Sequence, residues 1–206
     1  MRVGIFGGTF DPVHLGHLIL AEQCREQAKL DQVLFVPAAL PPHKQQQPLT
    51  SFAHRAEMLA LAISGHPAFR VDELEKERAG PSYTVHTLTH LHEQRPGDEL
   101  CFILGSDSVQ DLPIWYQPQR ILELATLVVV ARADWPIFSA QELKAQLQLS
   151  DNFPLRYQIV EAPLITIASR DVRKRIAEGR SVRYLIPRAV GAYIDDKGLY
   201  RETVRA

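Results

Sequence analysis

The chain has 206 residues, of which 46% are hydrophobic and 23% are charged, as is typical of a globular protein with one hydrophobic core. The formal net charge is −1 and Lys and Arg are scattered along the sequence. This disfavours a nucleic-acid-binding protein, because that class usually carries a basic stripe. No apolar run approaches the roughly 18 residues of a membrane-spanning helix, and no secretory leader precedes the first strand, so we expect a cytoplasmic protein without membrane partners.

Short apolar runs rich in β-branched residues alternate with segments of helical periodicity along the whole chain. This alternation predicts a single α/β domain over residues 1–206, with a doubly wound, mostly parallel sheet and a small C-terminal helical part at about 167–206. The expected strands and helices, in chain order within each class, are strands at 3–6, 33–36, 69–71, 100–104, 126–131 and 157–161, and helices at 15–28, 51–63, 84–94, 169–178 and 187–196.

The most informative segment is residues 7–17, which read GGTFDPVHLGH between the first strand and the first helix. Open α/β sheets bind their ligands at such junctions. The segment is not the dinucleotide-binding fingerprint, because GxGxxG is absent, and the chain contains no Gly-Lys-Ser/Thr of a Walker P-loop. Any phosphate chemistry must therefore rest on other residues.

Two histidines in this segment are the candidates for that chemistry. His14 and His17 are three residues apart, so both fall on one face of the first helical turn. Helix N-terminal N–H groups favour an anion there, and Gly7, Gly8 and Gly16 remove side chains where a polyphosphate would approach the backbone. Imidazoles can donate hydrogen bonds to oxygens around a reacting phosphorus. The H-x-G-H spacing disfavours chance histidines, and a zinc site lacks a suitably spaced third ligand.

The string at residues 7–17 resembles the H-x-G-H box of the adenylyl- and cytidylyltransferases, and it is similar in particular to that of the bacterial nicotinate-nucleotide adenylyltransferase family. The resemblance runs from residue 3 to about residue 201 and implies a Rossmann-like nucleotidyltransferase fold. It implies catalytic roles for His14, His17 and Arg173. The residues that it assigns to ATP are Gly7, Gly8, Thr9, Phe10, His14, His17, Gly105, Asp107, Ser169 and Arg173.

The same resemblance assigns four residues to the second substrate. Lys44 lies in the polar segment 41–48, the best candidate for a mobile loop, which without the family would be read as an ordinary solvated loop. Tyr83 and Thr84 start the third expected helix, and the resemblance implies that N–H groups there hold the nicotinate carboxylate. A helix N-terminus favours a carboxylate over a carboxamide, although an ordinary cap would look the same. Trp115 offers a flat face to a cationic pyridinium ring, or else belongs to the core.

Two later groups of residues are interpreted separately. Gly105 and Asp107 end a strand, where a carboxylate can accept hydrogen bonds from a ribose. His86, His90 and His92 include an i, i+4 pair, but there is no H-E-x-x-H motif, and we interpret them as a solvated helix face rather than a metal site.

Near the C-terminus, residues 167–173 read IASRDVR and resemble the family's I-S-S-T-x-I-R box, whose serine and arginine contact the ATP phosphates. Ser169 and Arg173 lie one helical turn apart, so both can face one anion. Ala168 stands where serine is usual and Arg170 where threonine is usual. Either Arg170 supplies a replacement charge, since guanidinium suits phosphate, or it points into solvent.

The resemblance implies that the adenylyl group of ATP is transferred to nicotinate mononucleotide. The products are nicotinate adenine dinucleotide (deamido-NAD) and pyrophosphate, Mg²⁺ accompanies ATP, and no metal is held by protein residues. A phosphate monoester is mostly dianionic at neutral pH, with a second pKa of about 6, so it needs no general base. The alternatives are another acceptor (nicotinamide mononucleotide, phosphopantetheine or glycerol phosphate) and a non-catalytic nucleotide-binding regulator. We expect a monomer or small homo-oligomer.

Overall fold

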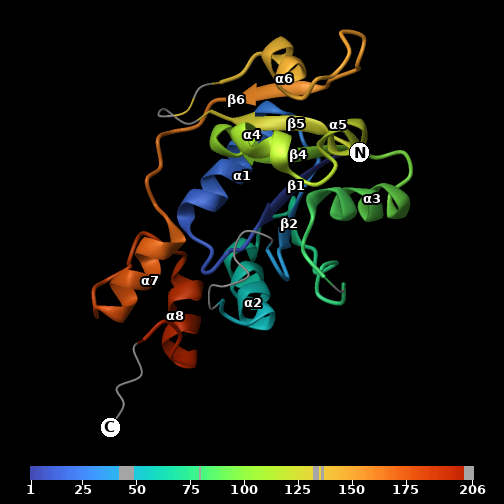
Figure 1. The fold of residues 1–206 in the computed structure, drawn as a ribbon. Coiled ribbons are helices and arrows are strands. Elements are labelled where there is room, and N and C mark those ends of the chain that lie inside the picture. The colour runs from blue at the N-terminus through green and yellow to red at the C-terminus, as the bar shows by residue number, and fades with distance from the viewer. Residues whose placement is uncertain (42–48, 79, 132–134, 136, 202–206) are drawn as a thin grey trace.

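In the computed structural model, which describes residues 1–41, 49–78, 80–131, 135 and 137–201, six parallel strands form one sheet in the order β3-β2-β1-β4-β5-β6 (Figure 1). The prediction of a doubly wound parallel α/β sheet is confirmed. The strands are β1 (Arg2–Gly8), β2 (Gln32–Pro37), β3 (Phe69–Val71), β4 (Glu99–Gly105), β5 (Thr126–Val130) and β6 (Tyr157–Val160). The helices are α1 (Leu15–Gln27), α2 (Phe52–Ile63), α3 (Thr84–Gln94), α4 (Ser106–Asp111), α5 (Pro118–Leu124), α6 (Ala140–Gln146), α7 (Ser169–Ala177) and α8 (Arg188–Lys197), with a 3₁₀ turn η2 at Leu112–Ile114.

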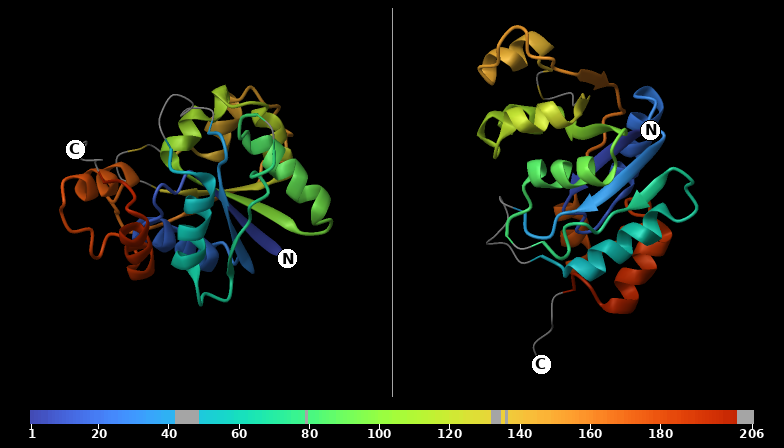
Figure 2. Two further views of the ribbon diagram at one scale, coloured as in Figure 1. Left: turned by 90° about the horizontal axis from the view of Figure 1, so that it is seen from below. Right: turned by 90° about the vertical axis from the view of Figure 1, so that its right-hand side faces the viewer.

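Helices cover both faces of the sheet (Figure 2). Successive strand residues point to opposite faces, so β2 sends Val33 and Phe35 into one core cluster and Leu34 and Val36 into the other. The first cluster is closed by α1, α2, α7 and α8, and the second by α3, α4, α5 and α6. This double burial explains why the strands read as continuous apolar runs rather than as alternating ones. No helix of the described residues is long and apolar enough to cross a membrane.

The sequence prediction located every strand and the five longer helices within one or two residues of their ends, and β3 and α3 at their observed limits. It missed α4, α5, α6 and η2. These elements have three to seven residues each, which is too short for helical periodicity to emerge from the sequence.

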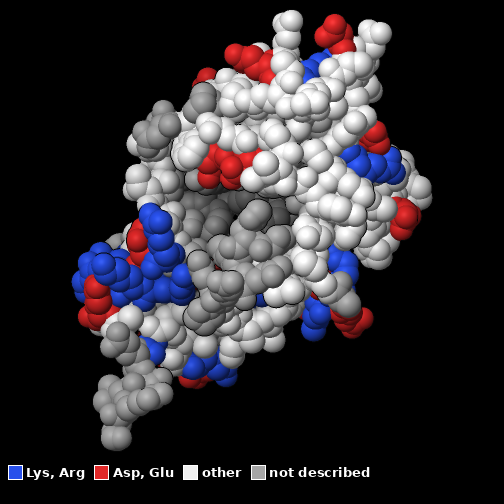
Figure 3. All heavy atoms as spheres, in the orientation of Figure 1, with Lys and Arg blue, Asp and Glu red and all other residues white. Residues whose placement is uncertain are grey.

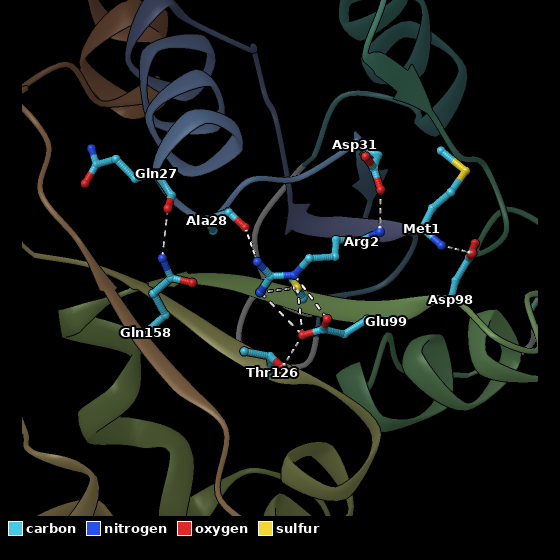
Figure 4. A network of polar contacts seen from close by, with 10 residues as sticks. Met1, Arg2, Gln27, Ala28, Asp31, Asp98, Glu99, Thr126 and Gln158 are labelled. Carbon is cyan, nitrogen blue, oxygen red and sulfur yellow. Dashed lines mark hydrogen bonds and ion pairs between the residues drawn. The ribbon is translucent and has the colours of Figure 1, made fainter.

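The amino edge of the sheet is closed by a polar network (Figure 4). The Arg2 guanidinium donates to the Ala28 carbonyl at 2.5 Å and to Glu99, and the hydroxyl of Thr126 also donates to Glu99, at 3.0 Å. These bonds connect β1 with β4, β5 and the end of α1. This edge is therefore occupied by structural contacts, and the opposite, carboxyl edge is left for a ligand.

The carboxyl edge contains the point at which the winding of the sheet reverses. The chain passes from β1 to β2 on one side and later returns to β4 on the other side of β1. Loops that follow two such adjacent strands diverge and leave a crevice, where open α/β sheets bind ligands. The segment 7–17 follows β1, and Gly105 ends β4, so both candidate segments lie at this crevice.

Candidate active site

The two histidines of the segment after β1 lie together at the start of α1. His14 is the N-cap residue, and its backbone N–H donates to Nδ1 of His17 at 3.2 Å. The two rings are stacked, with centroids 3.6 Å apart and planes 19° from parallel. Because Nδ1 of His17 is an acceptor, the neutral ring carries its proton on Nε2 and can donate from there. The prediction that both histidines share one face of the first turn is confirmed.

Aromatic rings beneath the histidines fix the position of His17. The Phe10 ring meets the His17 ring edge-on at a centroid distance of 5.0 Å, and Phe6 does so at 6.2 Å. Phe10 is only 2% exposed and lies in the core. An ATP contact at Phe10, as predicted, would therefore be made by its backbone, while its ring supports the histidine.

The glycines of the segment have different roles from one another. A Cβ atom on Gly7 would meet nothing within 4 Å, so this strand end is open toward the crevice, as expected of a backbone that a ligand approaches. A Cβ on Gly8 would come within 2.9 Å of the Phe10 ring, and one on Gly16 within 3.0 Å of Nδ1 of His14. The missing side chains at Gly8 and Gly16 thus make room for the rings of Phe10 and His14, and the approach of a polyphosphate to these two positions stays a prediction.

A buried arginine holds the loop ends around this segment. Arg55, on α2, is 1% exposed, and its guanidinium donates to the carbonyls of Thr9 at 2.9 Å, Ala38 at 2.8 Å and Thr50 at 2.9 Å. Burial lowers its pKa, yet an arginine stays protonated in proteins. One side chain thereby fixes the backbone that follows β1, the backbone that follows β2, and the entry to α2.

The C-terminal helical part meets the same segment from the other side. Ser169 donates its hydroxyl to the carbonyl of Pro12 at 2.9 Å, and Arg173 donates to the carbonyl of Asp11 at 2.6 Å. Both side chains thus meet the same loop, and the prediction that Ser169 and Arg173 together face one anion stays a prediction. Arg170 has 83% of its side chain exposed and lies 3.7 Å from Asp171. The solvent-facing alternative is therefore the one that the structure favours for Arg170.

This part of the chain is also the most basic. Residues 167–201 hold nine Lys and Arg against four Asp and Glu, although the whole chain has a net charge of −1. Figure 3 shows Lys and Arg gathered over α7, beside the hollowed middle of that face. Such an arrangement raises the local concentration of anions near the histidines.

A cavity of about 390 Å³ extends from the β1 end to the start of α3. It is lined by residues predicted to serve both substrates: Gly7, Gly8, Thr9, Tyr83, Thr84 and Trp115. Tyr83 is the N-cap of α3 and makes no side-chain cap hydrogen bond. The Tyr116 ring lies 4.8 Å from that of Tyr83, and Trp115 packs its edge against Phe102 at 6.1 Å. The volume falls within the range of small-molecule sites, roughly 300–1,000 Å³.

A buried carboxylate joins the two walls of this cavity. Glu75, 5% exposed, accepts a hydrogen bond from the Thr87 hydroxyl of α3 at 2.5 Å and one from the Ala39 backbone N–H at 3.2 Å. Arg78 pairs with it at 3.2 Å. Leu40 and Ser82 add two further bonds between the same walls. The backbone that leads into the segment 41–48 is thus fixed to α3.

The remaining candidates are placed as follows. Gly105 is the last residue of β4 and caps α4, and Asp107 lies in the first turn of that helix, at the carboxyl edge next to β1. His86, His90 and His92 are exposed, in agreement with a solvated face, and His86 also contacts the rings of Tyr83 and Tyr116. Lys44 and most of the segment 41–48 lie outside the described residues. Among those residues, no group of three or more His, Cys, Asp or Glu is placed to hold a metal ion.

Sequence reasoning missed Arg55, Glu75 and the buried contacts of Asp11. Arg55 did carry a signal, because it interrupts the apolar stripe formed by the buried residues Ala56, Met58, Leu59 and Ile63 of α2. Glu75 sits in a connection without periodicity and offered none. Asp11 lies in the segment 7–17 without a role of its own in the sequence analysis, yet it is 2% exposed and accepts hydrogen bonds.

Comparison with known proteins places these features in context. Residues 5–175 match the family model described as cytidylyltransferase-like. A probable nicotinate-nucleotide adenylyltransferase of Thermomicrobium roseum is 47% identical over 205 residues, covering 100% of this chain and 94% of the relative. One of Thermus thermophilus is 47% identical over 201 residues, covering 98% of this chain and 100% of the relative.

Solved structures agree in fold. The Plasmodium falciparum nicotinic acid mononucleotide adenylyltransferase complexed with NaAD superposes with a TM-score of 0.79 at 20% identity, covering 97% of each chain. A crystal structure described as that of a putative nicotinate-nucleotide adenylyltransferase from Vibrio parahaemolyticus superposes with a TM-score of 0.68 at 20% identity, covering 99% of this chain and 98% of the other.

Proposed function

The chain belongs to the cytidylyltransferase-like family, and from that premise we propose that it is a nicotinate-nucleotide adenylyltransferase of NAD biosynthesis. It transfers the adenylyl group of ATP to nicotinate mononucleotide and releases pyrophosphate. The observation that carries the proposal is the stacked pair of His14 and His17 at the sheet crevice, next to a cavity that ends at the N-terminus of α3.

The reaction is an in-line substitution at the α-phosphorus of ATP. A phosphate oxygen of nicotinate mononucleotide forms the new O–P bond, and the bond from the α-phosphorus to the oxygen bridging to the β-phosphorus breaks, with its electron pair leaving on pyrophosphate. The attacking phosphate is mostly dianionic at neutral pH, so no side chain has to remove a proton. The protein's contribution is then alignment of the two substrates and stabilisation of the charge that develops.

The histidine pair suits the second of these tasks. Nε2–H of His17 can donate to a phosphate oxygen, and the first-turn N–H groups of α1 provide further donors beside it. The basic C-terminal part adds a positive field from the α7 side. We propose that Arg173 and Ser169 there also contact the phosphates, beside the Asp11 and Pro12 carbonyls to which they donate in the structure. Lys44 is assigned to the acceptor phosphate, and Asp107 to a ribose hydroxyl.

Mg²⁺ is proposed to enter with ATP, bound by the phosphates of the nucleotide. Magnesium in such sites usually keeps several waters and takes most of its other ligands from substrate phosphates. When bound, it would neutralise part of the charge of the departing pyrophosphate. The described residues contribute no cluster of three ligands of their own.

The acceptor end of the cavity favours a carboxylate. The first turn of α3 presents backbone N–H groups that the side chain of Tyr83 does not cap, at the positive end of the helix dipole. A nicotinate carboxylate can accept these hydrogen bonds, whereas a nicotinamide NH₂ group would face other donors. The rings of Trp115 and Tyr116 line the same cavity and suit the flat pyridinium ring.

Pyrophosphate release with ATP and each of four acceptors tests the proposal: nicotinate mononucleotide, nicotinamide mononucleotide, phosphopantetheine and glycerol phosphate. We expect the highest kcat/KM with nicotinate mononucleotide. A higher kcat/KM with another acceptor would overturn the substrate assignment. Absence of release with all four would instead indicate a non-catalytic nucleotide-binding regulator.

A further inference from the structure

We propose that Tyr200 is a positioning residue for the reaction, acting through the buried carboxylate of Asp11 to hold the loop that carries His14 and His17. The inference rests on the proposed function for its assay, since it concerns how well the same site works. Its geometry, however, comes from residues at opposite ends of the chain. Tyr200 and Asp11 are 189 positions apart in the sequence and in direct contact in the fold.

The contact is short and buried. The Tyr200 hydroxyl donates to Oδ1 of Asp11 at 2.6 Å, and the backbone N–H of Thr50 donates to Oδ2 at 3.2 Å. Asp11 is 2% exposed, so its carboxylate depends on such donors for the solvation that water would otherwise provide. Burial, and then the hydrogen bond to Asp11, raise the pKa of Tyr200, so the hydroxyl keeps its proton and remains a donor at neutral pH.

Asp11 lies in the same loop as the histidines, so a displacement of its carboxylate would also move His14 and His17. Asp11 precedes His14 by three residues, and the carbonyl of Asp11 accepts from Arg173 while the carbonyl of Pro12 accepts from Ser169. The backbone N–H of Leu15 donates to the carbonyl of Leu185 at 2.9 Å. The C-terminal part thus holds residues 11–15 by their backbone at three points, and Tyr200 is the contact that holds the Asp11 side chain.

Asp11 is also held from the side of α2. Thr50, which donates to its Oδ2, has its own carbonyl bonded to Arg55 at 2.9 Å, and Arg55 also holds the carbonyl of Thr9. The loop is therefore fixed on one side by α2 and on the other by the C-terminal part, with the Asp11 carboxylate between them. Removal of the Tyr200 hydroxyl leaves the Asp11 carboxylate with its bond from Thr50 and without its bond from the C-terminal part.

Tyr193→Phe is a matched control for Tyr200→Phe. Both changes remove one hydroxyl from a tyrosine of the C-terminal part, and each hydroxyl makes a short hydrogen bond to a side chain outside that part; the Tyr200 hydroxyl also interacts with the side chain of Thr50. Tyr193 bonds to Nδ1 of His54 on α2, at 2.8 Å, instead of to the loop. Any loss that comes merely from loosening the C-terminal part should appear in both variants.

The experiment measures kcat, both KM values and the thermal midpoint for the two variants. We expect Tyr200→Phe to lower kcat by about tenfold or more, since small misplacements of reacting groups can cost up to 10²-fold. Its KM for nicotinate mononucleotide should change less than about twofold. Tyr193→Phe should keep kcat within about twofold, with a similar change in thermal midpoint. Equal kcat values in the two variants would overturn the inference.

A double-mutant cycle with Asp11→Asn separates positioning from a general structural effect. If Tyr200 acts through Asp11, the double variant should be about as slow as the slower single variant; multiplied losses would refute the inference. Binding of a non-hydrolysable ATP analogue, measured by calorimetry, provides a readout that does not depend on the acceptor. If the wild-type chain binds the analogue but does not turn over nicotinate mononucleotide, the proposed function fails. In that case, weaker binding of the analogue by Tyr200→Phe than by Tyr193→Phe would still support the positioning role.

Discussion

Arg55→Met should destabilise the protein strongly, although the residue touches no reacting group. Methionine keeps an unbranched apolar stem and removes the guanidinium. The carbonyls of Thr9, Ala38 and Thr50 then each lose a donor at 2.8–2.9 Å. The loss occurs in the interior, because the Arg55 residue is only 1% exposed. Buried acceptors without donors carry the full cost of their desolvation.

The size of the loss follows from two opposing effects. Each hydrogen bond to a charged group contributes about 1.5–3 kcal/mol, but removing the guanidinium also removes the cost of keeping a charge out of water. Three buried carbonyls left without this donor cost about 1–3 kcal/mol each, and the offset reduces the total to about 3–5 kcal/mol. For a domain of this length, 1 kcal/mol shifts Tm by roughly 2–4 °C, so Tm should fall by roughly 6–20 °C.

Urea unfolding followed by circular dichroism and a thermal scan would measure both quantities. Arg120→Met is the control, because Arg120 is half exposed and pairs with Glu123 at 2.9 Å; its effect should stay within about 0.5 kcal/mol. A free energy of unfolding for Arg55→Met within about 1 kcal/mol of the wild type would refute the reasoning. It would mean that the three bonds only offset the desolvation of the guanidinium.

Four further predictions concern the site itself. His17→Ala should lower kcat by roughly 10²–10³, as removal of one transition-state donor does; near-native turnover would contradict the role given to the pair. Nicotinate mononucleotide should exceed its amide in kcat/KM by about tenfold or more, since a carboxylate at a helix N-terminus is favoured by about 1–2 kcal/mol; equal values would show that α3 does not select the acceptor. Arg173→Ala should cost on the order of 2–3 kcal/mol in kcat/KM, as loss of a charge-assisted contact would, whereas the exposed Arg170→Thr should be near neutral in a parallel assay. Glu75→Gln should raise the KM for the acceptor several-fold and leave that for ATP unchanged, because the neutral amide loses the ion pair with Arg78 and its NH₂ group cannot accept from the Ala39 N–H; a matching rise in both KM values would argue against a local effect.

The sequence predicted the elements whose signal is local and long enough to repeat. The covered sheet was evident from continuous apolar strands, and α1, α3 and α8 from helical periodicity. The position of the histidines was predictable for the same reason, because a spacing of three within one helical turn is a local property. The environment of the histidines was less predictable. The rings of Phe6 and Phe10 under His17 depend on how β1 turns into the loop.

Contacts between distant segments were beyond prediction from the sequence alone. Ser169 and Arg173 were assigned to an anion, but nothing in residues 167–173 indicates that their side chains meet the carbonyls of Asp11 and Pro12. The roles of Glu75 and Arg55 likewise arise from carbonyls, amides and hydroxyls that the fold brings together. A carboxylate or guanidinium becomes structural when burial leaves it dependent on such partners, and burial is a property of the fold.

The link between Tyr200 and Asp11 also joins a loop that is synthesised early to a residue that is synthesised late. All six strands end by Val160, so the sheet and the histidine loop can form while the last segments are still inside the ribosome. The loop nevertheless receives its final restraint from residue 200, about 190 residues after it was made. A nascent chain, or one cut short after the sheet, would possess both histidines in a loop held from α2 but not yet from the C-terminal part. By the positioning role proposed for Tyr200, a chain that ends before this residue should still contain the adenylyl-transfer site but should turn over more slowly than one that includes it.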